Sequence, residues 1–245
     1  EMLRVEGLTS AGVLDNVSFT AYAGEILGFA GLVGAGRTET MRTIFGLEPK
    51  DSGDIYVKGK KVEIESPADA IKNKIAFLTE DRKGEGLILD AAVLNNLHLV
   101  TIDKYKKAKF FVDQEKQLEI GNQNVQTFKI KTPSLDTTAG SLSGGNQQKV
   151  VIAKWVNTDA DIYIFDEPTR GIDVGAKIEV YNVMNDLVKK GKCVIMVSSE
   201  LPEILGMSDR VIVMRNGRIM AEIDNDSKFF NQEDIMKASW GGVLS

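Results

Sequence analysis

The sequence predicts an α/β fold: a mostly parallel sheet flanked by helices, with an N-terminal antiparallel β subdomain and an inserted helical subdomain. Continuously apolar runs indicate the parallel sheet, because parallel strands are usually buried on both faces. These runs occupy residues 26–30, 75–78, 162–165, 194–197 and 211–214. Segments with helical periodicity lie between them, at residues 39–45, 147–157, 176–189 and 202–207. This alternation is typical of a sheet covered by helices.

The first part of the chain has a different strand pattern. Polar and apolar side chains alternate, as in half-exposed antiparallel strands, at residues 3–5, 14–20, 54–57 and 61–64. Residues 90–140 lack a continuous apolar strand and are predicted to be helical. We therefore expect one domain over residues 1–245 with three parts: a core and its β subdomain at 1–89 and 141–225, a helical subdomain at 90–140, and a C-terminal helical tail at 226–245.

The composition argues against several classes of protein. The 245 residues are 43% hydrophobic, which is enough for one large buried core. A formal charge of −5 makes nucleic acid an unexpected partner, because nucleic-acid binders need a basic surface. The only cysteine, Cys193, lies in an apolar run and suits a reducing compartment. No apolar stretch approaches the ~20 residues needed to cross a bilayer, so we expect any membrane association to depend on a protein partner.

A glycine-rich turn, GLVGAGRTE at residues 31–39, joins the first apolar strand to a helical segment. The backbone N–H groups of such a turn, together with the helix N-terminus, suit phosphate oxygens. Its glycines allow close backbone approach, and the Thr38 hydroxyl is a candidate Mg²⁺ ligand. Arg37 stands where lysine is usual, and it keeps the positive charge with a different geometry. The alternative is that the glycines only form a tight turn.

Two adjacent acids follow the apolar strand at residues 162–165. Asp166 is expected to hold Mg²⁺ and Glu167 to orient or deprotonate a water molecule, the alternative being a strand end that emerges into solvent. Upstream, SLSGGNQQKV at residues 141–150 places Ser143 at the N-cap of a helix whose first turn has two glycines. That helix N-terminus is open to an anion, unless the segment is an ordinary loop. We expect the acid pair on the strand that neighbours the strand before the glycine-rich turn, where both form a triphosphate pocket.

Four stretches, in order, resemble the ATPase domain of ABC transporters, and the resemblance covers the chain from about residue 3 to 224. They are the phosphate loop, LSGGNQQK, DEP and RGIDVGAK, in which Asp173 is the acid of the D-loop. Together with TEDRK and VSSELPE, they are similar to the C-terminal half of the tandem ATPase subunits of bacterial monosaccharide importers, of the ribose, galactose and xylose type. The resemblance implies a P-loop NTPase-type fold with ATP and Mg²⁺ as cofactors. Because the chain starts at Glu1 rather than methionine, we expect a fragment of a longer two-domain chain.

The resemblance also implies a set of site residues. The implied catalytic residues are Glu167, Glu80 and Ser199, and the implied Mg²⁺ ligands are Thr38 and Asp166. The implied nucleotide-binding residues are those of the loop, Gly31, Leu32, Val33, Gly34, Ala35, Gly36, Arg37, Thr38 and Glu39. In this family ATP lies between the phosphate loop of one domain and the signature of another, which implies a trans role for Ser143, Gly144, Gly145 and Asp173.

The implied cis site departs from the family's pattern. Arg37 replaces the lysine, Glu80 replaces the glutamine near the γ-phosphate, and Ser199 replaces the histidine. Glu80 is expected to repel the γ-phosphate unless Mg²⁺ or Arg82 compensates. No aromatic residue precedes Val13 to stack on adenine, and the only histidine of the chain lies in the helical subdomain, where we expect a structural or an exposed side chain. We therefore expect a degenerate cis site, an intact trans signature and weak ATPase activity of the isolated domain.

The resemblance implies partners as well. One is an integral membrane sugar permease, expected to dock around residues 82–87 and the helical subdomain. Another is the N-terminal ATPase half of the same polypeptide, or a second copy of this chain head to tail. The implied location is the cytoplasmic face of the bacterial plasma membrane, with the isolated domain soluble. Two alternatives stay open, a regulatory nucleotide-binding half with little or no hydrolysis and an ABC-type ATPase without transport.

Overall fold

The structure is a computed structural model that describes residues 1–108 and 111–243, and it divides into two compact units. The first unit comprises Glu1–Phe77, Ala160–Glu167 and Val183–Ser245, and the second comprises Leu78–Asp159 and Pro168–Asn182. The last two residues of the expected helical tail, 244–245, lie outside the described residues. The second unit is larger than the helical subdomain expected at 90–140, because it includes the signature helix as well.

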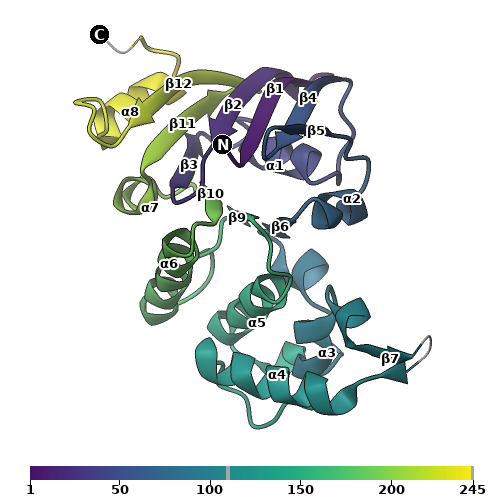
Figure 1. The fold of residues 1–245 in the computed structure, drawn as a ribbon. Helices are drawn as coiled ribbons and strands as arrows, with labels where there is room; N and C mark the ends of the chain where they lie inside the picture. Colours follow the sequence, from purple (N-terminus) through teal and green to yellow (C-terminus); the bar gives the residue numbers. More distant parts are fainter. Residues whose placement is uncertain (109–110, 244–245) are drawn as a thin grey trace. The chain divides into compact units, whose positions relative to one another are not determined.

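The first unit contains an antiparallel sheet with the strand order β2-β1-β4-β5 (Figure 1). Its strands are β1 (Leu3–Ser10), β2 (Leu14–Ala21), β4 (Ser52–Val57) and β5 (Lys60–Val62). In β2, the side chains of Leu14, Val17 and Phe19 are buried, whereas Asp15 and Ser18 are exposed. The polar and apolar alternation therefore predicted this β subdomain correctly.

The first unit also contains a six-stranded mixed sheet, with the order β12-β11-β3-β10-β9-β6. Its strands are β3 (Ile26–Gly31), β6 (Ile75–Leu78), β9 (Ile162–Asp166), β10 (Cys193–Val197), β11 (Arg210–Arg215) and β12 (Arg218–Asp224). The pairs β3–β10, β3–β11 and β9–β10 are parallel, and only the β11–β12 hairpin is antiparallel among the pairs whose register is defined. All five continuously apolar runs form strands of this sheet, which confirms the mostly parallel fold.

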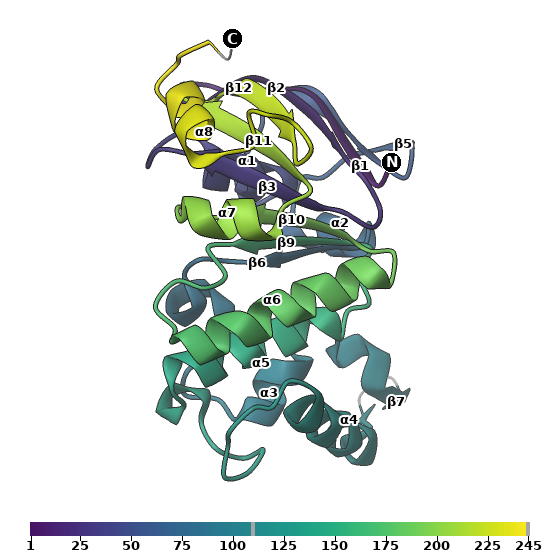
Figure 2. The same ribbon diagram turned by 90° about the vertical axis from the view of Figure 1, so that its left-hand side faces the viewer.

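One expectation about this sheet is wrong. Strand β10 lies between β3 and β9 (Figure 2), so the strand that bears the acid pair does not neighbour the strand that precedes the glycine-rich turn. The error has a physical source, because apolar runs identify buried strands but not their order. As a consequence, Ser198 and Ser199, which follow β10, lie between the glycine-rich turn and the acid pair.

Four helices belong entirely to the first unit: α1 (Arg37–Ile44), α2 (Pro67–Lys72), α7 (Leu201–Met207) and α8 (Gln232–Ser239). Helix α1 contacts β2 of the antiparallel sheet and β3 and β9 of the mixed sheet. Helices α7 and α8 contact β3, and α8 also contacts β11 (Figure 2). Strands β3 and β10 are almost wholly buried, so the centre of the core lies at the strands that lead into the candidate site.

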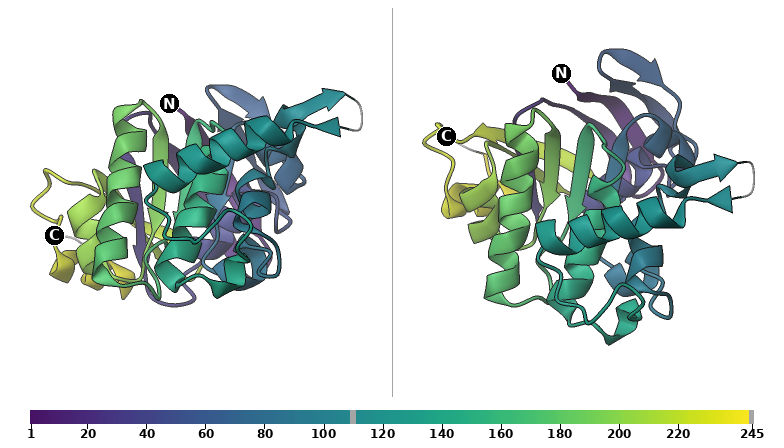
Figure 3. Two further views of the ribbon diagram at one scale, coloured as in Figure 1. Left: turned by 90° about the horizontal axis from the view of Figure 1, so that it is seen from below. Right: turned by 60° about the horizontal axis from the view of Figure 1, so that its bottom comes forward.

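The second unit is mainly helical, with α3 (Val93–His98), α4 (Gln114–Thr127), α5 (Gly144–Val156) and the first part of α6 (Val174–Lys189). Shorter turns are a π-helix at Arg82–Gly86 and 3₁₀ turns at Ile102–Tyr105 and Ala139–Ser141. The helical expectation for 90–140 is wrong at one place, because β7 (Lys106–Ala108) and β8 (Phe111–Val112) form a hairpin at the N-terminal end of α4 (Figure 3). Strands of three and two residues are too short for an alternation to be visible.

His98 is buried, and its Nε2 lies 2.9 Å from the carbonyl oxygen of Gln117, which agrees with the expected structural role. In the part of the chain that the structure describes, no helix has the length and apolar character needed to span a membrane.

Helix α5 contains a buried lysine whose charge has a measurable cost. Lys154 is 3% exposed, and its Nζ donates a hydrogen bond of 2.6 Å to the carbonyl oxygen of Gly86. Burial lowers the pKa of Lys154 to about 8. Because this folded-state pKa is below that of the unfolded chain, the stability contribution of Lys154 is present above the unfolded value and is lost as pH falls through 8.

We expect Lys154→Met to remove this pH dependence. Relative to the variant, the wild type gains about 2 to 3 kcal/mol of unfolding free energy as pH rises from 7 to 10. Urea denaturation of both proteins at pH 7 and at pH 10 measures this difference. The variant lacks the hydrogen bond to Gly86 at both pH values, so that loss cancels when the two pH values are compared. Parallel changes in the two proteins would contradict a lowered pKa for Lys154.

Candidate functional site

The glycine-rich turn connects the end of β3 to the first residue of α1. Gly31, Gly34 and Gly36 have φ angles of 152°, 78° and 99°, which favour glycine. A Cβ atom at Gly31 would lie 2.5 Å from the carbonyl oxygen of Met214, so no larger residue fits there. Gly36 is the N-cap of α1 and provides no side-chain cap. The helix therefore begins with backbone N–H groups suited to an anion.

Thr38 and Asp166 lie in contact, and the Thr38 Oγ1 donates a hydrogen bond of 3.1 Å to Asp166 Oδ1. Asp166 is 1% exposed, and its Oδ2 has no hydrogen-bond partner among the described residues. Burial is the main cause that raises the pKa of Asp166 to about 7. A hydroxyl oxygen and an unpartnered carboxylate oxygen are ligands that Mg²⁺ prefers, so Thr38 and Asp166 fit the ion.

Protein side chains alone do not complete a metal site here. Over residues 1–108 and 111–243, no three or more His, Cys, Asp or Glu side chains gather in a group able to hold an ion. Mg²⁺ commonly takes only one or two protein ligands and completes its shell with water and phosphate oxygens. The arrangement therefore fits an ion that arrives with a phosphorylated ligand.

Glu167 follows Asp166 with a φ of 47°, in the left-handed region that is uncommon for residues other than glycine. The Ser199 hydroxyl donates a hydrogen bond of 3.2 Å to Glu167 Oε2. The other carboxylate oxygen, Oε1, lies 3.9 Å from the Arg37 Nη2. The structure thus brings together three of the implied site residues, which follow β9, follow β10 and begin α1.

Arg37 points toward the ends of the strands. Its Nη1 donates a hydrogen bond of 2.7 Å to the carbonyl oxygen of Ser198, and the residue is 8% exposed. Burial lowers the pKa of Arg37, whereas the charges of Glu167, Asp166 and Glu39 oppose this shift. The guanidinium is therefore a buried cation among carboxylates.

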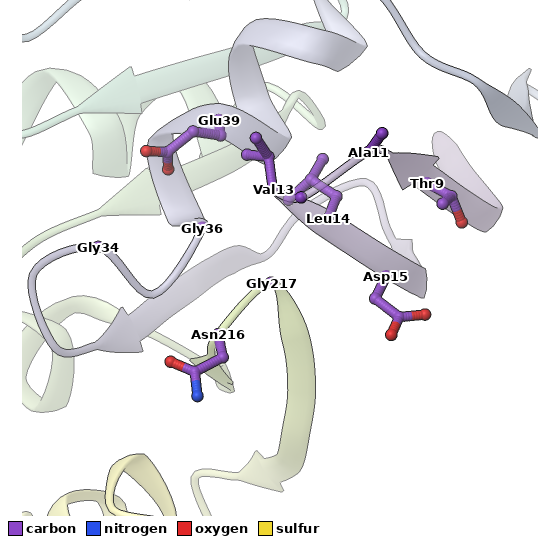
Figure 4. Close-up of a pocket in the computed structure, with 11 residues that line it drawn as sticks. Thr9, Ala11, Val13, Leu14, Asp15, Gly34, Gly36, Glu39, Asn216 and Gly217 are labelled. Carbon is purple, nitrogen blue, oxygen red and sulfur yellow. The ribbon is translucent and has the colours of Figure 1, made fainter.

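A cavity of about 640 Å³ lies beside the glycine-rich turn (Figure 4). Its lining residues come from β1, β2 and the turn between them, from the glycine-rich turn, and from the β11–β12 turn at Asn216 and Gly217. The backbone of Gly217 joins two of these segments, because its N–H donates to Ala35 and its carbonyl oxygen accepts from Asp15. None of the eleven residues that line this cavity is aromatic.

The second unit has a smaller cavity of about 250 Å³ at the start of α5. Ser143, Gly145 and Asp173 line it, so three of the four residues implied to act in trans lie together. Ser143 is the N-cap of α5 and makes no side-chain cap, and its Oγ accepts a hydrogen bond of 2.9 Å from Asn146. Gly144, the fourth, lies against the Arg82 guanidinium.

Glu80, also in the second unit, has a partner that the sequence analysis did not identify. It forms an ion pair with Arg170, whereas Arg82 donates hydrogen bonds of 3.0 and 3.3 Å to the carbonyl oxygens of Arg170 and Gly171. Arg170, rather than Arg82, is therefore the cation that pairs with Glu80. In the sequence, Arg170 and Gly171 are visible only as residues that follow the DEP stretch. Their contacts with Glu80 and Arg82 could be identified only from the fold.

A glycine-lined loop between a buried strand and a helix, with an acid pair within reach, defines a phosphate-loop nucleotide-binding protein, and the signature helix narrows it to the ABC type. A profile of the ABC transporter family matches residues 14–170. The chain belongs to the ABC transporter family.

Two curated relatives resemble almost the whole chain. The ribose import ATP-binding protein RbsA of Geobacillus kaustophilus is 50% identical over 242 residues, which is 99% of this chain and 48% of that protein. The xylose import ATP-binding protein XylG of Thermoanaerobacter pseudethanolicus is 52% identical over 231 residues, 94% of this chain and 45% of that protein. The chain thus spans about half the length of the curated relatives it matches.

Solved structures support the fold. A nucleotide-free ATP-binding cassette from an ABC transporter superposes with a TM-score of 0.80 at 24% identity, covering 97% of this chain and 94% of that one. A dimeric ATP-binding cassette bound to ADP and Pi superposes with a TM-score of 0.79 at 21% identity, covering 92% and 100% of the two chains. The expected fold class, with its parallel core and antiparallel subdomain, is confirmed.

Proposed function

We propose that this chain is an ATP-binding domain of a bacterial monosaccharide importer, which couples ATP binding and hydrolysis to transport at the cytoplasmic face of the membrane. The identity of about half of all positions with ribose and xylose import proteins is the observation that supports this proposal most strongly. A membrane sugar permease and a second ATPase domain, the other half of a tandem chain or another copy, are the proposed partners. The domain division proposed is a core at 1–89 and 141–225, a helical part at 90–140 and a tail at 226–245.

The proposed site residues have distinct tasks. Bound ATP and Mg²⁺ supply the phosphoryl bond that is hydrolysed and the cation that neutralises its oxygens. The loop at residues 31–39 binds phosphate through backbone N–H groups, and Thr38 and Asp166 hold the ion. Glu167 accepts a proton from water. Ser199 stands where the family has a histidine, and Glu80 stands where the family has a glutamine. We assign Ser143, Gly144, Gly145 and Asp173 to a nucleotide held by the partner domain.

Equilibrium binding of ATP and ADP, with and without Mg²⁺, tests the proposal. We expect ATP binding that depends on Mg²⁺, and little turnover by the isolated chain. Hydrolysis is expected to rise when the other ATPase half is added. No binding of either nucleotide, in a folded protein, would contradict the proposed function.

A second candidate is a regulatory half that binds nucleotide without hydrolysing it. The contacts of Glu167 with Arg37 and Ser199 favour it, because an attacking water would have to share the carboxylate with both of these partners. We expect Arg37→Lys to change turnover of the isolated chain by less than about threefold, since Ser199 still lacks an imidazole and Glu80 is still acidic. A steady-state phosphate-release assay measures this. Strong hydrolysis from that single substitution would show that Arg37 alone limits the site.

A further inference from the structure

The Glu167 carboxylate is held at both oxygens in the first unit. Oε1 lies 3.9 Å from the guanidinium of Arg37, and Oε2 accepts a hydrogen bond of 3.2 Å from Ser199. The side chains of Arg37 and Glu167 are about one-tenth exposed, so their charges face each other in a poorly hydrated place. Charges that are paired away from water depend strongly on one another, because removal of one leaves the other buried and unpaired.

The guanidinium also has a fixed direction. Its Nη1 donates a hydrogen bond of 2.7 Å to the carbonyl oxygen of Ser198, which follows β10. Because β10 lies between β3 and β9, this bond joins the start of α1 to the strand end beside the acid pair. We call Arg37, Ser198 and Ser199 the Glu167 clasp.

Phosphate binding in the loop does not require the guanidinium. The left-handed conformations of Gly34 and Gly36 shape the loop, and α1 begins without a side-chain cap. Helix N-termini and glycine-rich turns bind anions through backbone N–H groups. The loop can therefore provide the phosphate contacts while Arg37 contacts the carboxylate.

We infer that Arg37 is a positioning residue for Glu167 rather than a phosphate ligand. The clasp fixes the Glu167 carboxylate against a cation and a hydroxyl, and leaves phosphate to the backbone of the loop. This inference rests on the proposed function, because it assigns a role within the same nucleotide site. It explains why a cation is retained at position 37 in a loop whose phosphate contacts come from the backbone.

A double-mutant cycle on the nucleotide-free chain tests the clasp. We expect Arg37→Met and Glu167→Gln each to lower the urea midpoint, and the double variant to lie no lower than the less stable single variant. Arg42→Met and Glu48→Gln provide the matched control, because Arg42 lies on the same helix as Arg37 and pairs with Glu48 at a more exposed place. The effects of the two control substitutions on the urea midpoint are expected to be additive. Additive losses for Arg37 and Glu167 would overturn the inference.

Nucleotide binding by the same variants separates positioning from ligation. We expect Arg37→Met to weaken binding of MgATP by less than about threefold and to leave the ratio of the ADP and ATP dissociation constants unchanged. A loss of about 30-fold or more, or a changed ratio, would make Arg37 a phosphate ligand and overturn the inference. If the wild-type chain bound no nucleotide, the proposed function would fail, whereas the stability cycle would still decide whether the clasp exists.

Discussion

Asp166→Asn is expected to weaken binding of MgATP by at least about tenfold, since outer-shell changes alone cost metal sites that much. The amide retains the size of the carboxylate and can still accept the Thr38 hydrogen bond, but it provides no charge for the ion. Isothermal titration with ATP and Mg²⁺ measures the effect. The same titration in EDTA is the internal control, because the two proteins are then expected to bind ATP alike. Equal affinities with Mg²⁺ would remove Asp166 from the metal site.

The nucleotide-free stability of this variant provides an independent readout. The folded pKa of Asp166, raised to about 7 by burial, exceeds its unfolded value, so its stability contribution is present below the unfolded pKa and is lost as pH rises through 7. Between pH 4 and 8 the wild type is expected to lose about 2 to 4 kcal/mol relative to Asp166→Asn. Asp186→Asn, at an exposed ion pair, is the matched control and is expected to leave the pH profile unchanged.

The strands show how far the sequence predicted the fold. Continuous apolar runs identified five strands of the mixed sheet, because burial on both faces excludes polar side chains. Strand β12 was missed, since most of its residues are exposed or half-buried and three of the seven are charged. The hairpin β7–β8 was missed because it is too short for a period to show. Strand order was also beyond the sequence, and the position of β10 had to come from the structure.

The candidate site was predictable where one short segment defines it. The loop at 31–39 and the pair at 166–167 each have a local pattern, and the structure brings Thr38 and Asp166 into contact. Contacts between distant segments were not predictable. The ion pair of Glu80 with Arg170 and the bond of Arg37 to a backbone carbonyl oxygen both depend on which segments become neighbours. A backbone carbonyl oxygen that accepts such a bond cannot be identified from the sequence, because every residue has one.

Ser143→Arg tests the proposed trans role, and it is expected to have the largest effect on hydrolysis by the paired domains. Ser143 lines the cavity of about 250 Å³ at the start of α5, so an arginine side chain at this position would compete with a phosphate for the same space. When the variant is paired with the other ATPase half, phosphate release is expected to fall by about 100-fold or more, as when an anion-stabilising donor is removed. The variant's own affinity for ATP is expected to change by less than about twofold, because its phosphate loop is in the first unit.

Ser134→Arg is the matched control, because it adds the same charge at an exposed turn of the second unit and Ser134 does not line the cavity. It is expected to leave both hydrolysis and ATP affinity unchanged. Two outcomes would contradict the trans assignment in different ways. Unchanged hydrolysis in Ser143→Arg would mean that this helix N-terminus does not complete the partner's site. A joint loss of hydrolysis and of the variant's own ATP affinity would mean that Ser143 contacts the nucleotide bound by its own loop.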